Sequence, residues 1–156
     1  MVDCRIILGV NTFHADSSAC LIIDGKLIAA IEEERINRIK HYAGFPSEAI
    51  KECLKIANIN EKDVTDIAFN TKPLSNLIPK GIHYLRNHIF KENFSKKRFL
   101  KKKNIHKIFS DKLNLNKNIK FHYIEHHLAH IASAYYPSKF QKANGLSIDG
   151  SGDFVS

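Results

Sequence analysis

The stretch EHHLAHIASAYYPSKFQKANGLSIDGSGD, residues 125–153, begins with a helical pattern and ends with a strand-like pattern that runs into a glycine turn. His126 and His130 are four residues apart, which places both imidazoles on one face of a helix, about one turn apart. Residues 144–148 read as a buried strand that delivers Asp149 at its carboxyl end. Two histidines and one carboxylate form a facial triad, the ligand set that favours a divalent transition metal such as Fe(II). The alternative is two surface histidines and an aspartate in a turn.

The glycine turn DGSGD adds a second candidate site directly after this strand. A turn of this kind exposes backbone N–H groups that can bind a phosphate. Gly150, Gly152 and Asp153 are therefore candidate nucleotide-binding residues, next to the predicted metal ligands.

The composition is that of a globular protein: 156 residues, 44% hydrophobic and 26% charged, which fits one domain with a core. No run approaches the roughly 20 apolar residues of a membrane span, and no signal peptide is readable. Three cysteines (Cys4, Cys20 and Cys53) lack metal-ligand spacing, and we expect all three to be reduced and buried. These features predict a cytoplasmic protein with no membrane partner.

The net charge of +8 is concentrated in one segment. Residues 91–120 hold eleven Lys or Arg against two acidic residues, and the remainder of the chain is close to neutral. One basic segment on a near-neutral body favours a solvated helix over a nucleic-acid surface. A non-catalytic basic module that binds RNA or an acidic partner stays an alternative.

Hydrophobic patterning predicts a mixed α/β sheet with helices on its faces. The chain opens with three strands in an antiparallel meander, and Asp24-Gly25 is a type I′ hairpin signal between the second and third strands. Residues 32–41 are ambiguous between a loop and a short helix. The predicted strands are residues 5–10, 18–23, 26–32, 66–70, 120–124 and 146–149, and the predicted helices are residues 47–57, two within 74–115, and the helix that bears His126.

Two loops carry further candidates. The loop NTFHADSSA, residues 11–19, joins the first two strands and holds His14, whose ordinary pKa suits it to general base chemistry. Asp16 in the same loop can orient His14 or bind a cation. Lys40 lies in a cationic loop that can clamp an anionic substrate. The alternatives are a capped turn with a solvent-exposed histidine and an ordinary solvated loop.

Four motifs in this order resemble the carbamoyltransferases of the nodulation and antibiotic O-carbamoylation type. They are ILGVNTFHADSSACLIIDGKLIAAIEEER, RIKHYAGFPSEAI, EHHLAHIASAYYPS and SIDGSGD. The match covers the two ends of the chain, and residues 72–118 carry no recognisable motif. Four motifs in sequence are far more specific than any one of them.

The resemblance implies a fold and an activity. The amino-terminal domain of that family looks like the Kae1-type branch of the ribonuclease H-like, actin-like ATPase fold, which binds a nucleotide and a metal. A carboxy-terminal YrdC-like domain is associated with making carbamoyl-adenylate from carbamoyl phosphate and ATP. The Kae1-like domain then passes the carbamoyl group to a hydroxyl of a small-molecule or sugar acceptor.

Site residues follow from the matching motifs. The resemblance implies that His126, His130 and Asp149 ligate the metal, with a further carboxylate later in the family's chains. His14 would stand beside the acceptor hydroxyl as general base, and Lys40 would face carbamoyl or phosphate oxygens. Asp16 is assigned with the substrate-binding residues.

The chain is short for this family. We expect residues 1–156 to be an amino-terminal lobe that lacks the second lobe and the YrdC-like domain, and to be inactive alone. Sibling activities in the same fold are tRNA threonylcarbamoyl transfer and hydrogenase-maturation carbamoyl transfer. The HADSSA and RIKHYAGFP loops favour the small-molecule O-carbamoyl type over both.

Overall fold

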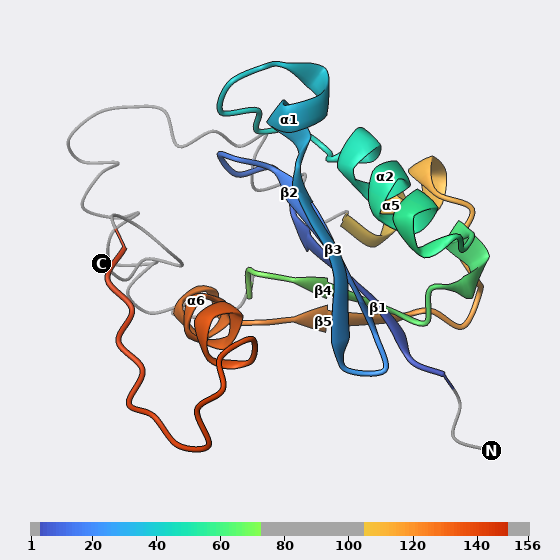
Figure 1. Ribbon diagram of the computed structural model, residues 1–156. Helices are drawn as coiled ribbons and strands as arrows, with labels where there is room; N and C mark the ends of the chain where they lie inside the picture. The colour runs from blue at the N-terminus through green and yellow to red at the C-terminus, as the bar shows by residue number, and fades with distance from the viewer. Residues whose placement is uncertain (1–3, 73–104, 150–156) are drawn as a thin grey trace, which may run out of the picture. The chain divides into compact units, whose positions relative to one another are not determined.

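The computed structural model describes residues 4–72 and 105–149 (Figure 1). The chain divides into two compact units. Of the described residues, 4–69 and 105–122 belong to the first unit, whereas 70–72 and 123–149 belong to the second.

Five strands and four α-helices are described, together with one 3₁₀ turn, η1, at Glu61–Asp63. The strands are β1 Ile6–Asn11, β2 Ser18–Ile23, β3 Lys26–Glu32, β4 Asp66–Phe69 and β5 Lys120–Tyr123. The helices are α1 Glu33–Asn37, α2 Ser47–Ala57, α5 Ile105–Lys112 and α6 His126–Tyr135. The ambiguous segment after β3 is thus a short helix, α1, followed by a loop.

The strands form one mixed sheet in the order β3-β2-β1-β4-β5, and Figure 1 shows the opening meander as the blue arrows. β1 pairs antiparallel with β2 and parallel with β4, and β2 pairs antiparallel with β3. The β2–β3 turn places Asp24 at φ 47° and Gly25 at φ 80°. Positive φ at both central residues is what a type I′ turn requires, and the predicted meander and α/β class are confirmed.

One face of this sheet is the core of the first unit. Alternation along β1 and β2 buries Leu8, Val10 and Leu21 on the same face, and α2 packs against β2 and β3. The predicted helix over residues 47–57 is confirmed. Its buried residues are Ala49, Ile50, Cys53 and Leu54, which recur at helical spacing.

Aromatic packing fixes α5 to this core. The ring centroid of Phe109 lies 4.8 Å from that of Phe45 and 5.2 Å from that of Phe69, both edge to face. Phe69 also stacks on Phe121 of β5 with centroids 6.2 Å apart. These rings connect the segment ahead of α2, the strands β4 and β5, and α5 within one unit.

Two expectations from the sequence are wrong. Residues 146–149 form no strand: they are irregular, with Leu146 84% and Ile148 86% exposed. Among the described strands, none pairs with them, and a strand is stabilised by its partner rather than by its own alternation. Cys4 is free but exposed, because it precedes β1, whereas Cys53 is buried and Cys20 is intermediate. Most of the two helices predicted within 74–115 lies outside the described residues.

Helices α1, α2, α5 and α6 are all too short to cross a lipid bilayer, so the described residues contain no candidate membrane span.

Candidate metal centre and neighbouring loops

Glu125 starts the helix that carries the two predicted histidine ligands. Its carboxylate accepts hydrogen bonds from the backbone N–H of His127 at 3.1 Å and of Leu128 at 2.8 Å, which caps α6. The bond from Leu128 does most to hold the pKa of Glu125 below its usual range, because it favours the charged carboxylate. This cap fixes the first turn of α6, where His126 lies.

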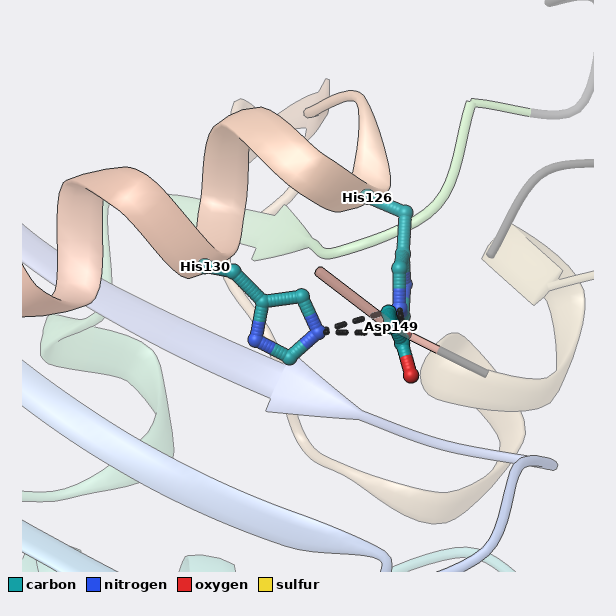
Figure 2. Close-up of side chains that lie close together, drawn as sticks. All are labelled: His126, His130 and Asp149. Carbon is teal, nitrogen blue, oxygen red and sulfur yellow. Dashed lines mark hydrogen bonds and ion pairs between the residues drawn. The ribbon is translucent and has the colours of Figure 1, made fainter. Parts of the chain in front are cut away.

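His126, His130 and Asp149 point toward one another in the second unit (Figure 2). His126 Nε2 lies 2.7 Å from Asp149 Oδ2, and His130 Nε2 lies 3.5 Å from the same oxygen. The two Nε2 atoms are 3.1 Å apart. His126 is buried, Asp149 is intermediate and His130 is exposed. The structure therefore brings together the three side chains that the spacing predicted as ligands.

A backbone carbonyl determines which nitrogen of His126 faces this group. Nδ1 of His126 lies 3.3 Å from the carbonyl oxygen of Asn70, directly after β4. A carbonyl oxygen only accepts, so this contact uses a proton on Nδ1 and directs Nε2 towards Asp149. The 2.7 Å separation of Nε2 and Asp149 Oδ2 fits either a shared proton or two ligands of one metal ion.

The donor set fits a single divalent ion. Bonds of about 2.0–2.2 Å at tetrahedral or octahedral angles separate neighbouring donor atoms by about 2.8–3.6 Å. The observed separations of 2.7, 3.1 and 3.5 Å fall in or close to this range. The Asn70 carbonyl supplies the kind of outer contact that orients ligating histidines. Two imidazoles and one carboxylate suit iron, zinc or a similar ion, and they leave further coordination positions open.

The candidate general base lies in the first unit, on the loop between β1 and β2. His14 is exposed at the tip of this loop, whereas Thr12 and Ser17 on its two sides are buried. Phe13 and Asp16, which flank the tip, have φ of 57° and 61°. Left-handed backbone at non-glycine residues is uncommon and needs support from the surrounding structure.

Asp16 binds a residue that the sequence did not single out as a partner. Its Oδ1 lies 2.9 Å from Nδ1 of His41, whose backbone N–H donates to Glu34 Oε2 at 3.0 Å. Asp16, Glu34 and His41 are therefore a second group with metal-ligand atoms, but they already bind one another, and Asp16 and His41 are exposed. Lys40 occupies the exposed turn next to His41.

Sequence patterns found the three clustered residues and missed those that orient them. The Asn70 contact is made by a backbone carbonyl, which leaves no signal in side-chain identity. Glu125 had a readable signal, because an acidic residue directly ahead of a helical pattern is a candidate cap. Gly150, Gly152 and Asp153 lie outside the described residues. His14, Asp16 and Lys40 belong to the first unit, and the clustered triad to the second.

Comparison with known families defines the class of protein. Residues 6–156 match the family described as the carbamoyltransferase N-terminus, and the chain belongs to this family.

The relatives that match it are longer. An uncharacterized protein of Synechocystis sp. is 36% identical over 96% of this chain, and nodulation protein NolNO of Sinorhizobium fredii is 34% identical over 94%. An uncharacterized 19.2 kDa protein of Rhizobium etli is 42% identical over 38% of this chain. The chain spans 26% of the length of the Synechocystis protein and 21% of NolNO.

Proposed function

We propose that this chain is the amino-terminal lobe of an enzyme that transfers a carbamoyl group to a hydroxyl of a small-molecule or sugar acceptor. The carbamoyl group comes from carbamoyl phosphate through an ATP-dependent carbamoyl-adenylate. The observation that carries the proposal is membership of the carbamoyltransferase N-terminus family over residues 6–156. The similarity to nodulation protein NolNO agrees with the resemblance to carbamoyltransferases of the nodulation type.

The fold class and the length of the relatives support the domain assignment. A mixed sheet that opens with a three-strand meander agrees with a Kae1-type, actin-like lobe. Because the chain spans about a quarter of its relatives, the proposal places the second lobe and a YrdC-like domain in the remainder of a longer protein.

The transfer step needs one proton acceptor and one oriented electrophile. The acceptor oxygen attacks the carbamoyl carbonyl carbon, the bond from that carbon to the adenylate oxygen breaks, and AMP leaves. The acceptor proton goes to an imidazole nitrogen of His14. His14 is exposed at the tip of its loop, between the buried residues Thr12 and Ser17. Lys40, an exposed cation, neutralises phosphate oxygens, and Asp16 holds His41 beside it.

The proposed metal site consists of His126, His130 and Asp149, with Fe(II) favoured by the facial triad. A bound divalent ion supplies Lewis-acid polarisation of phosphate or carbonyl oxygens. The chain's own contribution is orientation: the Glu125 cap and the Asn70 carbonyl fix His126 so that Nε2 faces the other two donors.

The test uses the complete product of the gene that encodes this chain, with ATP and radiolabelled carbamoyl phosphate. We expect pyrophosphate release that depends on carbamoyl phosphate, and label transfer to members of a panel of aminoglycosides and N-acetylglucosamine oligosaccharides. His14→Ala should retain pyrophosphate release, which reports adenylate formation, and lose label transfer by about 100-fold or more, because a general base contributes about 10²–10⁴-fold.

His106→Ala is the matched control, because His106 is another exposed histidine of the first unit, on α5. It should leave both activities unchanged. Absence of pyrophosphate release that depends on carbamoyl phosphate in the wild-type protein would contradict the proposal.

A further inference from the structure

We infer that the carbonyl of Gly44 is the anchor that positions His14, and that Thr12 and Ser17 are positioning residues for the transfer step. This inference rests on the proposed function only for the role of His14 as general base. The anchor itself consists of contacts between the β1–β2 loop and residues 41–46, all within the first unit.

Three donors from both sides of the His14 loop converge on one carbonyl oxygen. Gly44 O accepts from the Ser17 hydroxyl at 2.9 Å, from the Thr12 hydroxyl at 3.1 Å and from the backbone N–H of Phe13 at 3.2 Å. A fourth bond joins the same segments, from the Ser17 N–H to the carbonyl of Tyr42 at 2.9 Å. The loop is therefore closed at its base on both sides of His14.

Burial makes these hydrogen bonds decisive for the loop conformation. Ser17 is 1% and Thr12 is 6% exposed, so neither hydroxyl can replace its protein partner with bulk water. His14, between them, stays exposed. A loop that is buried where it leaves the sheet and exposed at its tip holds the His14 side chain in one place and leaves it accessible to a substrate.

Backbone strain at the tip points to the same conclusion. Phe13 is buried, bulky and left-handed at φ 57°, and Asp16 is left-handed at φ 61°. Such residues are strained and persist where the surroundings hold them. The convergence on Gly44 O supplies that restraint on one side of the tip, and the Asp16–His41 pair supplies it on the other.

Residue 44 is a glycine for reasons of space. A Cβ built on Gly44 would overlap the ring and hydroxyl of Tyr42, which packs over it. Gly44→Ala therefore displaces either Tyr42 or the carbonyl that anchors the loop, without removing any hydrogen-bonding group.

The experiment compares hydroxyl-deleting and hydroxyl-retaining variants in the complete gene product. Thr12→Val keeps the shape of the side chain and removes the hydroxyl, whereas Thr12→Ser keeps the hydroxyl. Ser17→Ala removes the second hydroxyl that donates to the same carbonyl. Thr65→Val is the control, because it removes a half-buried hydroxyl at the opposite end of the sheet, beside Ile6.

Two readouts separate positioning from general destabilisation. The imidazole NMR signals of His14 should broaden or split in Thr12→Val and Ser17→Ala, while those of His106 stay unchanged. Label transfer to the acceptor panel should fall about 10-fold in each single variant and about 100-fold in the Thr12→Val/Ser17→Ala double variant. The reason is that misplacement of a catalytic group by about 1 Å can lower the rate by about 100-fold. Pyrophosphate release, which reports adenylate formation by the YrdC-like domain, should stay within two-fold of wild type, and the unchanged His106 signals show that the first unit folds.

Thr12→Ser and Thr65→Val should resemble the wild type in both readouts. The inference is overturned if Thr12→Val and Ser17→Ala retain the His14 signals and the transfer rate of wild type while His14→Ala loses transfer. Loss of both readouts in Thr65→Val to the same extent would also overturn it, because the effect would then be one of stability. If His14→Ala itself retains transfer, the assignment of the general base fails instead, and the inference falls with it.

Discussion

At the residue scale, Asp66 is the most constrained carboxylate that the structure describes. It is 4% exposed and accepts from the Arg5 guanidinium at 3.0 and 3.2 Å, from His122 Nε2 at 2.6 Å and from the Thr65 hydroxyl at 2.7 Å. The Arg5 hydrogen bonds above all hold the pKa of Asp66 well below its usual range, since they favour the charged carboxylate. This network ties the residue ahead of β1 to β4 and β5.

Replacing this carboxylate should lower stability in a pH-dependent way. We expect Asp66→Asn to reduce the free energy of unfolding by about 1.5–3 kcal/mol at pH 7, the range for a hydrogen bond to a charged group. The larger loss that follows from breaking a buried ion pair does not apply, because Arg5 is largely exposed. The folded pKa is depressed, so the contribution is complete above the unfolded pKa of about 3.9 and is lost as pH falls below it toward the folded pKa.

Urea unfolding of wild type and Asp66→Asn at pH 7 and at pH 3 measures this difference. Glu52→Gln is the control, because its partner Lys55 is exposed and such pairs contribute little. A difference between wild type and Asp66→Asn that is as large at pH 3 as at pH 7 would contradict the assignment.

Single residues also show how far sequence patterns reach. His126 and His130 could be predicted because helical periodicity is a local property that tertiary packing did not override. The partners of Asp16 and His126 could not, because His41 and the Asn70 carbonyl reach them through folding of distant segments. The left-handed backbone conformation of Phe13 also has no sequence signal, since glycine, asparagine and aspartate are the residues that commonly adopt that conformation.

At the element scale, α6 depends on its cap. We expect Glu125→Ala to lower stability by about 0.5–2 kcal/mol, because two backbone N–H groups lose their acceptor. The loosened first turn should also weaken metal binding about 10-fold, the effect of losing an orienting contact.

Thermal unfolding and metal competition with a chelator measure these two effects. Glu125→Gln keeps only one of the two acceptor oxygens and should show smaller losses of stability and affinity than Glu125→Ala. Equal metal affinity in Glu125→Ala and wild type would show that the cap does not orient the ligands.

The aromatic contacts of α5 give a second prediction for an element. Phe109 is fully buried between Phe45 and Phe69, so Phe109→Ala should lower the free energy of unfolding by about 3–5 kcal/mol. Phe140→Ala, at a position that is 69% exposed, should change it by less than about 0.5 kcal/mol. Chemical denaturation of the two variants measures the contrast, and similar losses in both would refute the packing assigned to α5.

Element prediction succeeded where local signals agreed with tertiary pairing. The first three strands have strand-like apolar patterns, with a type I′ hairpin signal between the second and the third, and each pairs with a neighbouring strand in the sheet. The segment 146–149 carried the same apolar alternation without a partner among the described strands, and its apolar side chains are exposed. Alternation alone therefore does not decide whether a segment pairs.

At the scale of the whole molecule, the two halves of the proposed chemistry lie in separate units. The candidate base and Lys40 belong to the first unit, and the candidate metal ligands to the second. The family match extends over both units, from residue 6 to residue 156.

We therefore expect residues 1–156 alone to bind a divalent metal but to transfer no carbamoyl group. The reason is that the chain spans only 26% of the length of the Synechocystis protein and 21% of that of NolNO. Isothermal titration with metal and the carbamoyl phosphate assay, run on the same preparation, test both halves of this statement. Detectable carbamoyl transfer by the 156-residue chain would refute it.

The most direct test of the account is the metal content of the purified protein after anaerobic loading with Fe(II), measured by inductively coupled plasma mass spectrometry. We predict about one bound ion per chain in wild type and in the control His106→Ala, because three donors converge on a single position. His126→Ala, His130→Ala and Asp149→Asn should each fall to a small fraction of that value. Wild-type protein without bound metal, or ligand variants that bind as much as wild type, would contradict the assignment of the site.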